Sequence, residues 1–162
     1  GFQWFAVAGV TEENRSARSA EVMPSFATCV ADWQTQAGVT AAATALIGFS
    51  QGAVMALEST KLATPLASRV VAISGRFAAL PDAAPADVAV HMLHGKADTV
   101  IAYSHTVNAA HRLRDLGCDV TADVLPFIGH EIHPELAELV VTKLTTHIPQ
   151  RIWASVMEAS PK

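Results

Sequence analysis

The stretch ALIGFSQGAVMALE, residues 45–58, changes its hydrophobic pattern at Ser50. Residues 44–49 form an apolar run of the kind that makes a short buried strand. Residues 51–62 instead carry apolar side chains at helical spacing, which predicts a helix. Ser50 therefore lies where a strand gives way to a helix, and the role of this serine decides how the rest of the chain is interpreted.

Two glycines, Gly48 and Gly52, flank this serine. A serine on a sharp turn between a strand and a helix projects its hydroxyl from the sheet edge, and Gly-x-Ser-x-Gly is typical of that turn. The pattern alone recurs by chance, so its position at the strand-to-helix junction makes it informative. We expect that a side chain at Gly48 or Gly52 would collide with Ser50 or with the helix. The alternative is a small residue at an ordinary turn.

The remaining chain alternates apolar strands with helices. The predicted strands are residues 69–73, 88–93 and 119–127, and the predicted helices are residues 11–38, divided near Pro24, 103–116 and 135–147. Nearly continuous apolar strands separated by helices indicate a parallel sheet covered on both faces. We expect one α/β domain over residues 1–162, with a mostly parallel sheet and helices on both faces.

Composition excludes several classes of protein. The 162 residues include 11 Lys and Arg against 15 Asp and Glu, a net charge of −4, and the basic residues are scattered, so no nucleic-acid surface is predicted. Polar residues interrupt every apolar run before the roughly 18 residues of a membrane helix. Cys29 and Cys118 have no paired spacing, which predicts reduced thiols in a cytoplasmic protein.

A nucleophilic serine needs a base that takes its proton and an acid that orients the base. Asp98 follows the predicted strand at residues 88–93, and His130 follows the strand at residues 119–127. One helix and one strand separate them, so both loops emerge at the same sheet edge as Ser50. The competing acids lie at the opposite edge, within a strand or before one: Asp82, Asp87, Asp115, Asp119 and Asp123. We predict Asp98 as the acid and His130 as the base.

His133 is the rival base. It precedes Pro134 at a predicted helix start, whereas Gly129 would let the backbone turn tightly and present His130. The spacing HEIH in residues 130–133 also differs from the H-E-x-x-H spacing that places two imidazoles on one zinc ion.

Two further histidines, His91 and His94, lie three residues apart on a predicted strand. Side chains at that spacing point to opposite faces of a sheet, so the two are not a natural chelating pair and structural roles are expected. Together with the absence of zinc spacing around His130, this leads us to predict no metal and no cofactor.

Four segments in order, GFQWFAVAG, ALIGFSQGAVMALE, HGKADTVI and GHEIHPE, resemble the bacterial carboxylesterase/phospholipase group related to acyl-protein thioesterases. The resemblance covers nearly the whole chain and implies an α/β-hydrolase fold. It implies Ser50 as nucleophile, Asp98 as orienting acid, His130 as base and the Gln51 backbone N–H as one oxyanion donor. Trp4 and Phe5 match the WF pair beside the cleft of that group, although core packing explains aromatic residues equally well.

Members of that group have strands before the WF segment, and a loop among them supplies a second oxyanion N–H. This chain has no residue before Gly1 and no signal-peptide pattern, so we expect it to begin within the domain, with N-terminal strands missing. A central strand left at an edge invites pairing with another chain, which makes a homodimer one expectation.

The predicted reaction is hydrolysis of carboxylic esters of short to medium acyl chains, with thioesters second. The apolar, alanine-rich loop at residues 75–85 and the apolar residues Phe127, Ile128 and Ile132 predict an uncharged acyl or alkyl group of the substrate near the nucleophile. No basic cluster in the sequence predicts recognition of a large anionic head group. The alternative from another class is a non-catalytic hydrolase scaffold that acts in binding or dimerisation.

Overall fold

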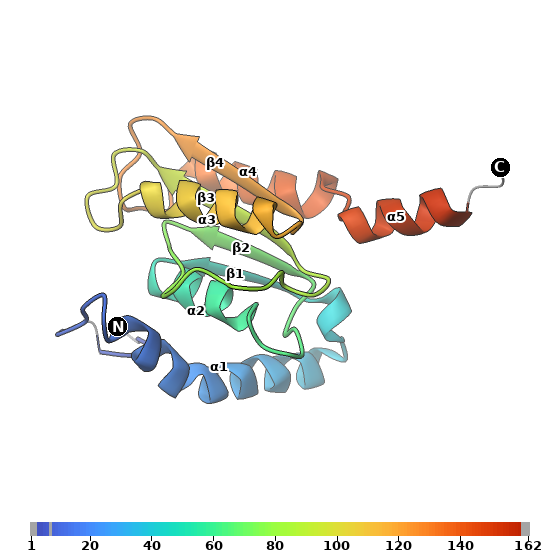
Figure 1. Ribbon diagram of the computed structural model, residues 1–162, viewed down its shortest axis with the longest axis horizontal. Helices are drawn as coiled ribbons and strands as arrows, with labels where there is room; N and C mark the ends of the chain where they lie inside the picture. The colour runs from blue at the N-terminus through green and yellow to red at the C-terminus, as the bar shows by residue number, and fades with distance from the viewer. Residues whose placement is uncertain (1–2, 7, 160–162) are drawn as a thin grey trace.

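Four parallel strands form the centre of the molecule, in the order β1-β2-β3-β4 (Figure 1). The computed structural model describes residues 3–6 and 8–159. Its strands are β1 (Ala45–Phe49), β2 (Arg69–Ile73), β3 (Ala89–Gly95) and β4 (Val120–Leu125), and each neighbouring pair runs parallel. The predicted parallel sheet is confirmed, and the strand ends differ from the predicted ones by no more than two residues.

Helices cover both faces of this sheet (Figure 1). They are α1 (Arg15–Ala37), the short 3-10 helix η1 (Ala41–Ala43), α2 (Gln51–Ser59), α3 (Ser104–Asp115), α4 (Pro134–Thr146) and α5 (Gln150–Ala159). Buried side chains of α2 and α3 share one cluster with β2 and β3, whereas α4 shares a second cluster with the other side of these strands. The expected arrangement of helices on both faces is therefore confirmed.

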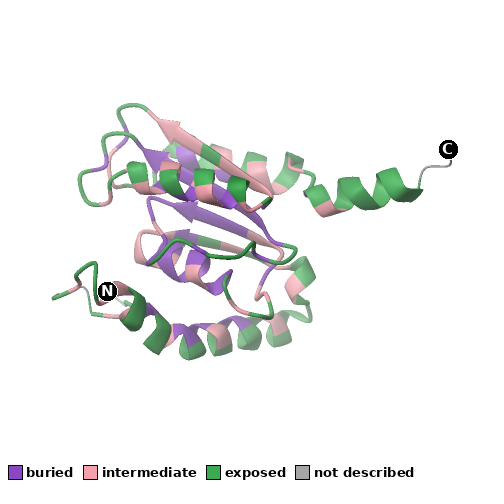
Figure 2. Ribbon diagram, viewed as in Figure 1, coloured by how far each residue is buried: buried purple, intermediate pink, exposed green. Residues whose placement is uncertain are grey.

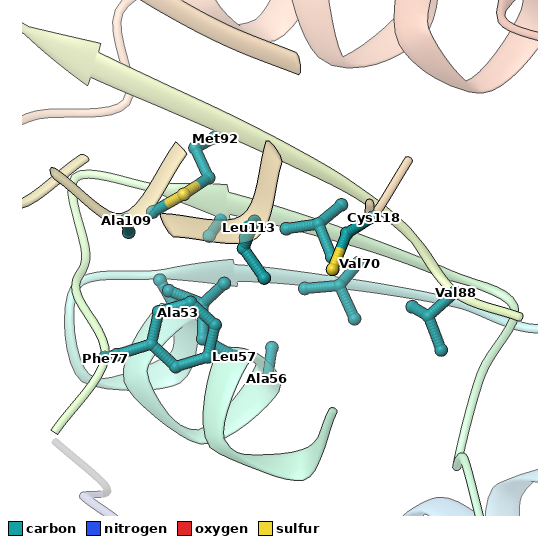
Figure 3. Close-up of a cluster of buried hydrophobic side chains, with 12 residues drawn as sticks. Ala53, Ala56, Leu57, Val70, Phe77, Val88, Met92, Ala109, Leu113 and Cys118 are labelled. Atoms are coloured by element: carbon teal, nitrogen blue, oxygen red, sulfur yellow. The ribbon is translucent and has the colours of Figure 1, made fainter. Parts of the chain in front are cut away.

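The alternation of side chains along β2 explains why both faces are apolar. Val70 and Ala72 join the cluster with α2 and α3, which Figure 3 shows, and Val71 and Ile73 join the cluster with α4. Successive residues of a strand point to opposite sides of its sheet, so a strand covered on both sides needs apolar residues at every position. The result is a rigid sheet that holds the loops at its carboxyl edge.

Pro24 does not divide the first helix, contrary to the prediction. α1 runs without interruption from Arg15 to Ala37 with Pro24 inside it. A proline inside a helix costs about 3 kcal/mol because it removes one backbone hydrogen bond and crowds the preceding turn. Here Pro24 and Ala20 are both exposed, so water can reach the carbonyl that loses its donor. The buried residues Met23, Phe26 and Val30 pack against Met55 of α2 and hold both halves of the helix together.

α5 was not predicted from the sequence. It extends away from the sheet, and none of its described residues is buried (Figures 1 and 2). Two contacts hold its start: the Gln150 N–H donates to the Asp119 carboxylate at 2.9 Å, and the Arg151 guanidinium donates to the Asp87 carbonyl at 2.8 Å. In the described part of the chain, no helix has the length and apolar character needed to cross a membrane.

Candidate active site

Ser50 occupies a strained turn between β1 and α2. Its backbone has φ 52° and ψ −115°, in a region that residues other than glycine rarely adopt. The Ser50 N–H donates to the carbonyl of Ile73 on β2 at 3.0 Å, which fixes the turn to the sheet. The Ser50 side chain makes no capping hydrogen bond to α2, so its hydroxyl is available to another partner.

Close approach of α2 to the sheet depends on glycines, but not on both that were predicted. A Cβ at Gly48 would lie 2.3 Å from the Gly52 carbonyl oxygen and 2.5 Å from the Ala53 nitrogen. A Cβ at Gly52 would meet nothing within 4 Å, so the steric reason expected for Gly52 is wrong. Gly75, after β2, has the second steric role, because its Cβ would lie 2.3 Å from the Ala53 Cβ.

The structure brings Ser50, His130 and Asp98 together in one chain of hydrogen bonds. His130 Nε2 lies 2.9 Å from Ser50 Oγ, and His130 Nδ1 lies 2.8 Å from Asp98 Oδ2. With the carboxylate ionised, Nδ1–H donates to Asp98 and Nε2 accepts the hydroxyl proton of Ser50. The tilted ring of Phe49 packs beside His130, with ring centroids 4.9 Å apart. This arrangement allows a proton to pass from the serine to the imidazole.

The Asp98 carboxylate is enclosed and fully supplied with donors. Its side chain is inaccessible to solvent, and Oδ1 accepts the N–H groups of Val100 at 2.8 Å and Ile101 at 2.9 Å. Burial acts to raise the pKa of Asp98, but the hydrogen bonds from His130 and from the Ile101 and Val100 amides outweigh it, so the pKa lies below its ordinary value. Asp98 therefore stays ionised beside His130 at neutral pH.

His94 also contacts this carboxylate. His94 Nε2 lies 3.2 Å from Asp98 Oδ2 and 2.9 Å from the Ile101 carbonyl oxygen, and Nδ1 lies 2.8 Å from Thr106 Oγ1. Burial lowers the pKa of His94 and outweighs the opposing effects of the Ile101 carbonyl and the Asp98 charge. A neutral ring that donates from Nε2 satisfies these contacts. The sequence predicted a structural role for His94, but spacing alone did not reveal its contact with Asp98.

The rival histidine His133 has a different role. It is the N-cap residue of α4, and its Nδ1 accepts the Glu135 N–H at 3.3 Å. The backbone reason for preferring His130 was wrong, because Gly129 has no positive φ and a Cβ there would meet nothing within 4 Å. The left-handed residue of this loop is Phe127, with φ 64°. His91 points to the opposite face of β3 from His94, as expected.

A cleft of about 530 Å³ opens beside Ser50, between α2 and the N-terminal segment. Phe5 and Val54 give it apolar walls, and Glu12, Arg15, Arg76 and His105 also line it. The sequence shows no basic cluster, but the fold brings Arg15 and Arg76 together in this cleft. The loop after β2 turns Phe77 into the core and leaves Arg76 facing the cleft.

The two aromatic residues of the WF pair have separate positions. Phe5 lines the cleft, whereas Trp4 packs edge-on against Phe26 of α1, with ring centroids 4.9 Å apart. The Gln51 side chain joins this segment to α2, because Oε1 accepts the Trp4 N–H at 2.7 Å and Nε2 donates to the Phe5 carbonyl at 2.7 Å. Phe5 also packs against the buried cluster of α1 and α2, so core packing applies to both residues and the position beside the cleft to Phe5 alone.

A model of the phospholipase/carboxylesterase family matches residues 1–148. The chain belongs to this family. Esterase YpfH of Escherichia coli strain K12 is 47% identical over 150 residues, which are 93% of this chain and 65% of that protein. The chain thus spans slightly less than two thirds of the length of this family relative.

Solved structures agree with the phospholipase/carboxylesterase assignment. The crystal structure of esterase PE8 is 28% identical, with a TM-score of 0.76 over 89% of this chain and 69% of that one. The structure of Zea mays acyl-protein thioesterase 2 is 26% identical, with a TM-score of 0.66 over 88% of this chain and 71% of that one. The resemblance drawn from the four sequence segments is confirmed.

Proposed function

We propose that the protein is a serine esterase that cleaves carboxylic esters through an acyl-serine intermediate. The observation that supports this most strongly is the hydrogen-bonded chain from Ser50 Oγ through the His130 ring to Asp98. It lies at a strained strand-to-helix turn beside a cleft, in a member of the phospholipase/carboxylesterase family. Geometry, access for a substrate and family membership thus support the same reaction.

In the first step His130 Nε2 takes the Ser50 proton as the serine oxygen attacks the ester carbonyl carbon. The tetrahedral intermediate collapses, the bond to the alcohol breaks, and His130 gives its proton to the departing oxygen. Water then attacks the acyl-serine with His130 again as base, which releases the carboxylic acid and restores the serine. Asp98 remains ionised and stabilises the imidazolium in both steps.

The Gln51 backbone N–H is our candidate donor to the oxyanion. Gln51 is the first residue of α2, so its N–H has no acceptor within the helix, and the positive end of the helix dipole lies there. The side-chain bonds of Gln51 to Trp4 and Phe5 hold this residue in place. Removal of one oxyanion donor costs about 10² to 10³ in turnover in serine hydrolases, so the donor count strongly affects the rate.

We propose short to medium acyl esters as substrates, with thioesters second. Phe5 and Val54 supply an apolar wall next to Ser50 in a cleft of about 530 Å³, which suits a small acyl group. The named relatives include both an esterase and an acyl-protein thioesterase. No cofactor enters this mechanism. A cytoplasmic location remains a prediction, with Cys29 and Cys118 both free thiols.

The single-domain assignment and a homodimer also remain predictions. The edge of β1 offers one surface for self-association, since β1 is an outer strand of the described sheet and Ile47 on it is 52% exposed. Sedimentation of the purified 162-residue chain over a range of concentrations tests this, and a single monomeric species at every concentration would exclude the homodimer.

Labelling with a fluorophosphonate probe tests the function. The samples are the protein and its Ser50→Ala variant. Ser74→Ala is the matched control, because Ser74 also directly follows a strand with a positive φ and has a buried hydroxyl without a partner. We expect a mass adduct on the Ser50 peptide in the protein and in its Ser74→Ala variant, and none in the Ser50→Ala variant. Absence of labelling from the folded protein would favour the non-catalytic scaffold.

A further inference from the structure

Four side chains that line the cleft form a polar cluster with contacts among its members: Glu12, Arg15, Arg76 and His105. The Arg76 guanidinium makes two parallel bonds to the Glu12 carboxylate, Nη1 to Oε1 at 2.9 Å and Nη2 to Oε2 at 2.7 Å. This paired geometry is the one by which arginine recognises carboxylates. Glu12 and Arg76 are separated by 64 residues in the sequence, so only the fold brings them together.

The protein holds Arg76 rigidly in this position. Its Nε donates to the Phe77 carbonyl at 3.1 Å, Nη1 lies 3.0 Å from His105 Nε2, and its side chain is only 13% exposed. Arginine can only donate, so His105 Nε2 accepts and the ring is neutral. Burial and then the Arg76 charge lower the pKa of His105, which keeps it in that form. The guanidinium is thus fixed before any ligand arrives.

The cluster carries excess positive charge. Arg15 Nη2 donates to Glu12 Oε1 at 3.2 Å, so two guanidinium groups share one carboxylate while His105 is neutral. Arg15 Nε is buried and has no hydrogen-bond partner. A buried donor without an acceptor is costly, so the contact with Glu12 leaves the Arg15 guanidinium incompletely satisfied. The cluster therefore has the net positive charge to hold a carboxylate in the place of Glu12.

Glu12 is the most exposed member of the three ion-paired residues in this cluster. Its side chain is 66% exposed and it precedes α1, whereas the two arginine side chains are 13% and 22% exposed. The hydrogen bond from Arg76 holds the pKa of Glu12 below its ordinary value, so Glu12 is a carboxylate at neutral pH. When Glu12 leaves, its charge passes into water and the guanidinium groups face the cleft.

We infer that this cluster of cleft-lining residues binds a carboxylate carried by the substrate, in the place that Glu12 fills in the free protein. The inference rests on the proposed esterase function and narrows its substrate class to esters whose acyl or alcohol part bears a carboxylate. Arg76 is the specificity-determining residue, and Glu12 competes with the ligand for it. The two residues should therefore affect selectivity in opposite directions.

Selectivity is measured on the protein as the ratio of kcat/KM for an anionic ester to that for a neutral one. On the acyl side, 4-nitrophenyl hydrogen glutarate is compared with 4-nitrophenyl pentanoate, which has the same carbon chain. On the alcohol side, 4-acetoxybutyrate is compared with butyl acetate in a pH-stat. The pair of esters whose ratio changes in the variants identifies whether the acyl part or the alcohol part of the substrate carries the carboxylate.

We expect Arg76→Gln to lower the ratio about tenfold or more, since a hydrogen-bonded charge pair is lost. Glu12→Gln should raise it about threefold or more, because the competing carboxylate is gone. Arg76→Lys keeps the positive charge but loses the paired hydrogen bonds of the guanidinium, so its selectivity ratio should lie between those of the wild type and Arg76→Gln. Arg114→Gln is the control, since Arg114 is exposed on α3 and pairs only with Asp115 in the described contacts.

An equal loss on anionic and neutral esters in both Glu12→Gln and Arg76→Gln would overturn the inference, because a purely structural ion pair would behave in that way. Ratios unchanged in both variants would overturn it as well. A binding measurement separates this failure from failure of the esterase proposal. Glutarate is titrated into the Ser50→Ala variant while the ring signals of His105 are followed by NMR, with glutaramide as the neutral control.

We expect glutarate, but not glutaramide, to shift the His105 signals to saturation. Adding Glu12→Gln should tighten the dissociation constant, and adding Arg76→Gln should abolish the shift. This binding measurement does not depend on ester cleavage, so failure of the esterase proposal would not by itself overturn carboxylate recognition. Equal responses to glutarate and glutaramide would refute carboxylate recognition.

Discussion

His91 should make the protein sensitive to mild acid. This residue of β3 is fully buried on the α4 side of the sheet; its Nδ1 lies 2.8 Å from Thr121 Oγ1, and its Nε2 has no hydrogen-bond partner. The ring of His147 packs edge-on against it, with centroids 4.7 Å apart. Burial, followed by the charges of His147, Lys143 and Arg69, lowers the pKa of His91 from 6.5 to about 4.

The direction of the change in stability with pH follows from proton linkage. The unfolded chain binds a proton at His91 with an ordinary pKa near 6.5, whereas the folded protein resists it until about pH 4. Protons therefore favour the unfolded state, and stability falls as the pH drops from about 6.5 to about 4. A shift of this size is worth about 3 kcal/mol when complete. At pH 5 the loss relative to pH 7 is about 2 kcal/mol.

Urea unfolding at pH 7 and pH 5, followed by circular dichroism, measures this loss. In His91→Leu, a substitution of similar volume, the fall in unfolding free energy between the two pH values should be smaller than in wild type by about 2 kcal/mol. His111→Gln, which changes an exposed histidine of α3, is the control and should keep the wild-type dependence. An equal fall in wild type and His91→Leu would refute the assignment of acid sensitivity to His91.

Three further predictions concern the candidate site. Gly48→Ala should destabilise the fold by about 1–3 kcal/mol in thermal unfolding, because its Cβ would meet the first turn of α2. Gly52→Ala should be neutral or stabilising by up to about 1 kcal/mol, and equal destabilisation by the two variants would contradict the steric argument. Asp98→Asn should lower kcat about 10⁴-fold in a protein that is still folded by circular dichroism, and a loss under tenfold would exclude Asp98 as the orienting acid. His94→Gln should lower kcat more than it raises KM and should move the downfield proton signal of the His130–Asp98 hydrogen bond in NMR spectra, and an unchanged signal would show that His94 does not position Asp98.

The order of strands and helices could be read from the sequence because burial leaves a periodic pattern in it. The apolar runs of β2 and β3 and the helical spacing after Ser50 record which side chains face the core. The juxtaposition of Ser50, Asp98 and His130 was also predictable, since each follows a parallel strand and the carboxyl ends of such strands share one edge. Local pattern and topology were sufficient for these features.

Other features needed the distances between segments far apart in the chain. The continuity of α1 through Pro24 depends on contacts with α2, and the need for Gly75 depends on how closely Ala53 approaches it. The paired hydrogen bonds from the Arg76 guanidinium to the Glu12 carboxylate join residues whose spacing follows no period of a helix or a strand. Sequence alone determined the four strands, the helices that pack on them and the edge at which the candidate site lies, because hydrophobic burial is encoded locally, whereas the exposed helix α5 left no such pattern. Only the tertiary structure decided the steric fit around Ser50 and the charge of its cleft, because both depend on separations of a few ångströms between distant parts of the chain.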